Sequence, residues 1–338
     1  MLDISKLEKI DTDKMYKIYE EWPKIALKSF ELEYSPINLD EVKHIVFAGM
    51  GGSGAIGDMF SSILSKTKIH VNVVKGYLLP YTVDADTLVI VVSVSGNTAE
   101  ALSILDSACK IGSKIIVFSS GGKMEEFCKK NNIEHKMVPK YHSPRASFTS
   151  YLYTILNVLH KTLEIEQNDI IESIKELENI KKKIDSLNLT DNNPAIELAK
   201  WIKGIPMVYY PFGLQSAAIR FKNSIQENAK LHTATEDVIE FCHNGIVAWE
   251  IPSKHQPILL QGTEDNIKTK EKYEVLKEFF RAKNIDYKEV TSVNGNIISK
   301  IVSLIYLLDY TSIYKAVMLG IDPSPVKSIE FIKSKSKN

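Results

Sequence analysis

The first half of the chain alternates short, uninterrupted apolar segments with longer segments of helical periodicity. The uninterrupted apolar segments lie at residues 44–48, 70–74, 87–93, 114–119 and 134–139. Such runs are typical of parallel strands that are covered on both faces. Between them, residues 54–65, 97–111 and 122–131 have the pattern of helices. Strands that alternate with helices predict a doubly wound α/β domain.

The second half repeats this order of elements. The pattern predicts helical regions over 146–163 and 167–188, strands at 205–211, 256–262 and 285–290, and helices at 213–230, 266–283 and 296–318. The sequence NLTDNNP after the first helical regions has the composition of a linker. We therefore predict an α/β fold with two tandem doubly wound parallel-sheet domains, residues 1–152 and 193–338. A helical connector over 153–192 joins them, and a C-terminal tail follows Pro323 and Pro325.

Composition limits the classes of protein to be considered. The 338 residues, 44% of them hydrophobic, are enough for two globular domains. Lys+Arg and Asp+Glu each total 42, so net charge gives no reason to expect nucleic acid or an acidic membrane as a partner. No apolar run approaches the roughly 20 residues of a membrane span, and residues 1–14 lack the apolar core of a signal peptide. Cys109, Cys128 and Cys242 have no metal-ligand spacing, so we expect a cytoplasmic protein without a metal.

A glycine-rich sequence, GMGGSGAIG, follows the first predicted strand at residues 49–57. At the start of a helix, unpaired N–H groups and the helix dipole favour an anion. Gly51 and Gly52 let the backbone approach such a ligand, and Ser53 adds a hydroxyl. The alternative is a tight turn without a ligand. A dinucleotide site is a poorer match, because a serine stands beside the third glycine of GMGGSG and Lys75 follows the next strand where an acidic residue is expected.

A second strand-to-helix turn, SVSGNTAE at residues 93–100, carries more donors. It offers the hydroxyls of Ser93, Ser95 and Thr98 beside the amide of Asn97. A helix N-cap is the alternative interpretation, but an N-cap needs only one such side chain. The carboxyl ends of parallel strands meet at one edge of a sheet, where ligands of open α/β folds bind. The two turns together therefore predict a site that surrounds a phosphate group with uncharged donors.

At these two turns the chain resembles the sugar isomerase (SIS) domain family, whose phosphosugar-binding loops are similar to GMGGSG and SVSGNTAE. From about residue 40 to the tail it resembles the bifunctional phosphoglucose/phosphomannose isomerases, which carry two SIS domains of the flavodoxin-like sandwich type. Four further segments carry this resemblance: SPRAS (143–147), RFKNSIQENAK (220–230), EFCHNG (240–245) and IEFIK (329–333). The resemblance implies an isomerase of glucose 6-phosphate and fructose 6-phosphate, with mannose 6-phosphate as a further substrate and no cofactor.

The resemblance also implies roles for individual residues. Glu227 would move a proton between C2 and C1 of the sugar through a cis-enediol. His243, contributed by the partner subunit of a homodimer, and Lys333 would act in ring opening, and Arg145 would stabilise the enediolate. The phosphate would be held by Gly51, Gly52, Ser53, Ser93, Ser95 and Thr98. Taken alone, Glu227 is more typical of a solvated helix face than of a catalytic base, and His243 is more typical of a structural histidine.

Two positions depart from the pattern of that family. Gly245 stands where the family commonly has a glutamate after His-Asn. Val326, with Ser324 as the nearest hydroxyl, stands where the family has a threonine linked to activity on both C2 epimers. Phosphomannose activity is therefore predicted less directly than phosphoglucose activity.

Arginine is rare in this chain, which has only Arg145, Arg220 and Arg281. Lysine cannot imitate the planar donor fork of arginine. Arg220 precedes Glu227 on the same predicted helix, and we expect it to be structural and to pair with a carboxylate.

Two other function classes compete with an isomerase. SIS domains also serve as phosphosugar-binding modules of regulators, but no DNA-binding helix-turn-helix extension is evident and Glu227, His243 and Lys333 are all present. An amidotransferase would need an N-terminal glutaminase with a nucleophilic cysteine, and the first cysteine is Cys109.

Overall fold

The structure is a computed structural model that describes residues 2–34, 37, 39 and 42–336. It divides into two units. Unit A comprises residues 17–174 and 327–338, and unit B comprises residues 1–16 and 175–326. The N-terminal residues join unit B through hydrogen bonds such as Thr12 Oγ1 to Asp322 Oδ2 at 2.7 Å and Tyr310 Oη to the carbonyl of Tyr16 at 3.2 Å. The units are therefore not consecutive along the chain, unlike the predicted division at residues 152 and 192.

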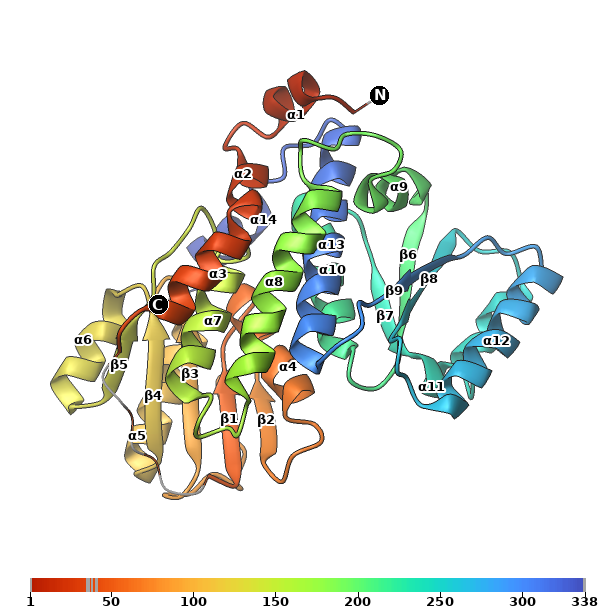
Figure 1. The fold of residues 1–338 in the computed structure, drawn as a ribbon. Helices are drawn as coiled ribbons and strands as arrows, with labels where there is room; N and C mark the ends of the chain where they lie inside the picture. The colour runs from red at the N-terminus through yellow and green to blue at the C-terminus, as the bar shows by residue number, and fades with distance from the viewer. Residues whose placement is uncertain (1, 35–36, 38, 40–41, 337–338) are drawn as a thin grey trace. The chain divides into compact units, whose positions relative to one another are not determined.

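Unit A contains a five-stranded parallel sheet in the order β2-β1-β3-β4-β5 (Figure 1). Its strands are β1 (His44–Ala48), β2 (His70–Val74), β3 (Leu88–Ser93), β4 (Lys114–Ser119) and β5 (Glu134–Met137). Its helices are α3 (Trp22–Glu31), α4 (Gly52–Ile63), α5 (Ala99–Ile111), α6 (Gly122–Asn131), α7 (Phe148–Leu159) and α14 (Lys327–Lys335). The five strands and α4, α5 and α6 confirm the predicted elements, with bounds that differ by at most two residues.

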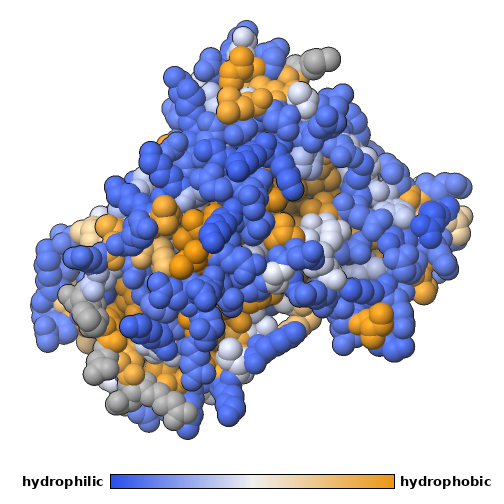
Figure 2. Space-filling model, in the orientation of Figure 1, coloured by the Kyte–Doolittle hydropathy of each residue, from blue (hydrophilic) through white to orange (hydrophobic). Residues whose placement is uncertain are grey.

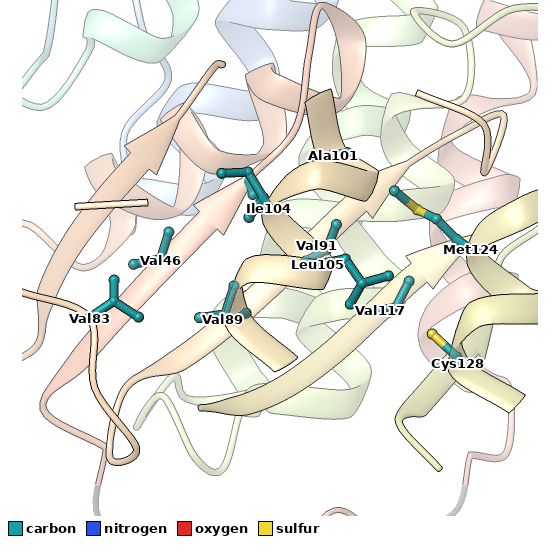
Figure 3. Packing of buried hydrophobic residues seen from close by; sticks show 12 residues of the cluster. Val46, Val83, Val89, Val91, Ala101, Ile104, Leu105, Val117, Met124 and Cys128 are labelled. Carbon is teal, nitrogen blue, oxygen red and sulfur yellow. The ribbon is translucent and has the colours of Figure 1, made fainter. Parts of the chain in front are cut away.

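Both faces of the unit A sheet are covered, as its uninterrupted apolar strands predicted. On one face, valines of β1, β3 and β4 pack against Ile104 and Leu105 of α5 and against Met124 of α6 (Figure 3). On the other face, Phe47 of β1 stacks on Phe60 of α4 with ring centroids 4.8 Å apart. This packing holds the first turns of α4 and α5 at the carboxyl edge of the sheet.

Unit B contains a four-stranded parallel sheet in the order β7-β6-β8-β9. Its strands are β6 (Ile205–Tyr210), β7 (Ala234–Asp237), β8 (His255–Gln261) and β9 (Lys288–Thr291). Its helices are α1 (Ile4–Ile10), α9 (Pro194–Trp201), α10 (Gln215–Asn228), α11 (Val238–Phe241), a 3₁₀ helix (Gly245–Glu250), α12 (Ile267–Ala282) and α13 (Ile297–Met318). Two helices, α2 (Met15–Glu20) and α8 (Gln167–Ile184), run from one unit into the other.

Helix α13 is long and apolar enough to cross a membrane, in contrast to the expectation that no segment approaches that length. Its most apolar window has a mean hydropathy of 1.3, but 83% of that window is buried inside the protein. Burial of this kind is the behaviour of a core helix. The face drawn in Figure 2 is mostly hydrophilic, with hydrophobic residues in scattered areas rather than in one continuous belt.

The contact between α10 and α13 has a polar centre. Arg220 pairs with Asp309 at 2.6 Å, and the side chains of these two residues are only 2% and 0% exposed. Ser224 donates to the second Asp309 oxygen at 2.5 Å, and one turn further on Asn228 donates to Ser312 Oγ at 2.8 Å. Residues spaced by four lie on one face of a helix. The expectation that Arg220 pairs with a carboxylate is confirmed.

Candidate functional site

The glycine-rich sequence forms the turn between β1 and α4. Gly51 has a φ of +53°, a conformation that favours glycine. A Cβ at Gly52 would lie 3.0 Å from the carbonyl of Pro144, a tight contact that the glycine avoids where the segment around Pro144 comes close. Ser53 is nearly buried, and its hydroxyl accepts a hydrogen bond from the N–H of Val94 at 3.2 Å. This bond joins the first turn to the second, as the prediction of a shared site requires.

The SVSGNTAE sequence forms the turn between β3 and α5. Thr98 occupies the N-cap position of α5, yet its side chain makes no capping hydrogen bond. Its hydroxyl instead lies 2.9 Å from the hydroxyl of Ser93, which also accepts a hydrogen bond from the N–H of Gly96 at 3.1 Å. Ser95 is exposed, and its hydroxyl accepts from the N–H of Asn97 at 3.2 Å. The alternative interpretation, in which the hydroxyl of Thr98 caps the N-terminus of α5, is therefore wrong.

A third turn, residues 119–122 between β4 and α6, lies against the second turn and was missed in the sequence analysis. The Ser120 hydroxyl donates to the carbonyl of Val94 at 2.6 Å. The N–H of Met124 donates to the carbonyl of Gly96 at 3.0 Å. An added side chain at Gly96, which has a φ of +66°, would meet the carbonyl oxygen of Gly121 at 1.7 Å. The signal was the SSGG sequence at the end of the fourth predicted strand.

Arg145 belongs to a tightly held segment beside the first turn. The hydroxyl of Ser147 accepts from the N–H of Tyr141 at 2.9 Å, and Trp22 Nε1 donates to the carbonyl of Ala146 at 2.8 Å. The backbone nitrogen of Arg145 lies 3.2 Å from the position of an added Cβ at Gly52, and its side chain is 3% exposed. Unit A therefore brings Arg145 and the glycine-rich turn together, as predicted.

Lys333 also belongs to unit A. The predicted tail ends in a helix, α14, on which Lys333 is exposed. Ile329, Phe331 and Ile332 of the same helix are exposed as well.

Glu227 lies in the last turn of α10 in unit B, and its side chain is half-buried. Lys230, with a φ of +57°, donates from Nζ to the carbonyl of Glu227 and to that of Pro325, the latter at 2.8 Å. The turn that carries Glu227 is therefore tied to the segment that contains Ser324 and Val326.

His243 follows α11 in unit B, and its side chain is exposed. Its backbone N–H donates to the carbonyl of Glu240 at 2.9 Å, and the Asn244 side chain donates to a Glu240 carboxylate oxygen at 2.6 Å. These bonds fix the turn but leave the imidazole of His243 facing solvent. Among the residues that the structure describes, no group of three or more His, Cys, Asp or Glu side chains could hold a metal ion.

Models of known protein families match the two parts of the chain that form the two sheets. A model of the SIS domain matches residues 38–160, and a model of the C-terminal SIS domain of bacterial phospho-glucose isomerase matches residues 191–335. Two proteins named bifunctional phosphoglucose/phosphomannose isomerase are each 33% identical to this chain. The one from Caldicellulosiruptor bescii matches over 88% of this chain and 91% of its own length, and the one from Aquifex aeolicus over 96% and 99%. The chain belongs to the bifunctional phosphoglucose/phosphomannose isomerase family.

A solved structure supports the fold of this isomerase family member. The C-terminal domain of glucosamine-fructose-6-phosphate aminotransferase from Francisella tularensis has a TM-score of 0.71 and a sequence identity of 17%. The match covers 92% of this chain and 98% of that domain. The predicted α/β fold with tandem SIS domains is therefore confirmed.

Gly245, the first departure from the pattern of the phosphoglucose/phosphomannose isomerases, is crowded by two side chains. A Cβ at Gly245 would lie 2.7 Å from Phe241 Cδ2 and 2.8 Å from Glu236 Oε2. Burial raises the pKa of Glu236, and the neighbouring carboxylates of Glu240 and Asp237 raise it further. Glu236 was not predicted from the sequence, because β7 brings it to Gly245 from nine positions earlier in the chain.

Proposed function

We propose that this protein is an aldose–ketose isomerase that interconverts glucose 6-phosphate and fructose 6-phosphate, and mannose 6-phosphate and fructose 6-phosphate. The observation that carries this proposal is the 33% identity, over 88% and 96% of the chain, to two proteins named for both activities. The paired turns of unit A support it, because their hydroxyl and N–H groups suit a phosphate.

The proposed substrate phosphate lies at the carboxyl edge of the unit A sheet. Donors come from Gly51 and Gly52 at the start of α4 and from the hydroxyls of Ser53, Ser93, Ser95 and Thr98. Uncharged donors and two helix N-termini stabilise a phosphate dianion there. The phosphate group takes no part in the reaction, so these residues hold the sugar while others act on it.

The proposed chemistry belongs to Glu227, His243, Lys333 and Arg145. Ring opening removes the proton of the anomeric hydroxyl and protonates the ring oxygen, and His243 with Lys333 supplies this acid–base pair. Glu227 then takes the proton from C2 and returns it to C1, while a proton moves between the two oxygens. The Arg145 guanidinium offsets the negative charge of the enediolate.

The proposal includes a cytoplasmic homodimer in which His243 acts in the site of the partner subunit. The exposed imidazole of His243 supports this arrangement, since an exposed side chain is available to a second copy of the chain. Free Cys109, Cys128 and Cys242 agree with a reducing compartment.

A coupled assay with glucose 6-phosphate and with mannose 6-phosphate tests the proposed activity. We expect turnover of both sugars by the wild-type protein, with both reactions lost together when Glu227 is replaced. Binding of both sugars without turnover would favour the alternative of a phosphosugar-binding regulator. Turnover of glucose 6-phosphate alone would contradict the phosphomannose part of the proposal. The position of Val326, where the family has a threonine, would then account for the loss of that activity.

Replacing Ser93 with alanine tests the phosphate site. We expect KM for glucose 6-phosphate to rise about tenfold with a smaller change in kcat, since the hydroxyl organises Thr98 and Gly96 and a hydrogen bond to a charged group contributes about 1.5–3 kcal/mol. Ser107→Ala is the matched control, because that hydroxyl of α5 lies 2.9 Å from the carbonyl of Ser103. Equal KM values for the two variants would contradict the assignment.

A further inference from the structure

His135 and Ser119 form a hydrogen-bond network that the proposed mechanism does not use. Ser119 is the last residue of β4 and is 0% exposed, and its hydroxyl lies 2.8 Å from Nε2 of His135 on β5. The same hydroxyl lies 3.0 Å from the carbonyl oxygen of Gly121 and accepts from the N–H of Gly121 at 3.2 Å. One serine oxygen thus links the imidazole to both polar groups of Gly121.

Counting protons assigns the direction of each bond. A serine hydroxyl has one proton, and the carbonyl of Gly121 can only accept. All three contacts are hydrogen bonds when Ser119 donates to this carbonyl and accepts from Gly121 N–H and from a protonated His135 Nε2. Burial lowers the pKa of His135, although the carboxylates of Glu125 and Glu134 oppose this effect. The imidazole is therefore a donor to Ser119 in its neutral form, as the Nε2–H tautomer.

Gly121 transmits this arrangement to the second turn. Its carbonyl oxygen packs against Gly96 so closely that no side chain fits there. The N–H of Lys123 donates to the Asn97 side chain at 3.1 Å, which is a further hydrogen bond between this part of the chain and the second turn. Gly96 in turn donates to Ser93, one of the proposed phosphate ligands. A displaced Gly121 carbonyl would therefore displace the backbone that holds the Ser93 hydroxyl.

We propose that His135 is a positioning residue for the phosphate site, acting through Ser119 and Gly121 on the turn that contains Gly96 and Ser93. It makes no contact with the substrate in this arrangement. The inference rests on the proposed function, since it takes the second turn to be a phosphosugar site.

The test compares His135→Leu with His135→Gln, whose amide N–H can replace the Nε2–H donor. We expect His135→Leu to raise KM for glucose 6-phosphate and Kd for inorganic phosphate by about five- to tenfold, the worth of one or two neutral hydrogen bonds, with kcat within about twofold. His135→Gln should restore both values to near wild type. Ser119→Ala should resemble His135→Leu, and the double variant should be no worse than Ser119→Ala alone.

His44 provides the matched control in the same sheet. Its ring nitrogens lie 3.1 Å from Thr87 Oγ1 and 2.8 Å from Asn72 Oδ1, but it begins β1 and so lies at the amino edge of the sheet. His44→Leu should lower the melting temperature without raising Kd for phosphate. An equal rise in Kd in His44→Leu, or no rise in Kd in His135→Leu, would overturn the inference. Because Kd for inorganic phosphate needs no turnover, the inference is tested even if the protein proves not to isomerise sugars.

Discussion

Replacement of Glu227 with glutamine is expected to lower kcat for both sugar phosphates by roughly 10³-fold, within the range of general acid–base catalysis. Glutamine keeps the size of the side chain but cannot take the C2 proton. In the proposed site the turns of unit A, rather than Glu227, hold the phosphate, so KM should change by less than about threefold. A loss of kcat without a loss of binding is the result that a proton-transfer base predicts.

Glu264→Gln is the matched control for this substitution. Glu264 also belongs to unit B, and its carboxylate, 70% exposed, pairs with Lys300 at 2.5 Å. The same change of acid to amide there should leave kcat unchanged. Solvent exchange gives a second readout, because wild-type enzyme in deuterated water should place deuterium at C2 of the recovered sugar and Glu227→Gln should not. A Glu227→Gln variant with wild-type kcat would assign the base to another residue.

The strands were predictable wherever burial on both faces leaves a continuous apolar run. β3 is buried along its whole length, and TLVIVVS was predicted to within one residue. β7, by contrast, is a four-residue edge strand with the sequence ATED, which carries no such signal. The helices α1, α2 and α9 are six to eight residues long, too short for a clear apolar period. Tertiary contacts rather than local pattern determine these elements.

The candidate site was predictable where its residues are neighbours in the sequence. Ser93 and Thr98 share one turn, and the rule that parallel strands end at one edge was enough to pair that turn with Ser53. Glu236 and His135 were not predicted, because each lies beside a residue that is distant from it in the sequence, Gly245 and Ser119 respectively. Only the structure shows that Glu236 meets Gly245 and that His135 reaches Ser119.

The buried ion pair between α10 and α13 predicts a large effect on stability. Asp309→Ala would leave the Arg220 guanidinium, 2% exposed, without its carboxylate. Removing one partner of a buried pair costs about 3–5 kcal/mol, which corresponds to a fall in melting temperature of roughly 10 °C for a unit of this size. Because Arg220 and Ser224 hold the helix that carries Glu227, kcat should fall as well.

Two comparisons separate the buried charge from a general loss of packing between α10 and α13. The double variant Arg220→Met with Asp309→Leu removes both charges and keeps apolar volume, so it should recover most of the lost melting temperature. Glu197→Ala breaks the more exposed Glu197–Lys288 pair, in which the side chains are 59% and 33% exposed, and should change the melting temperature little. Thermal unfolding followed by circular dichroism measures all three. If Asp309→Ala were as stable as Glu197→Ala, the Arg220–Asp309 pair would not hold α10 in place. The orientation of Glu227 would then have to depend on the hydrogen bonds of Lys230 to Glu227 and Pro325.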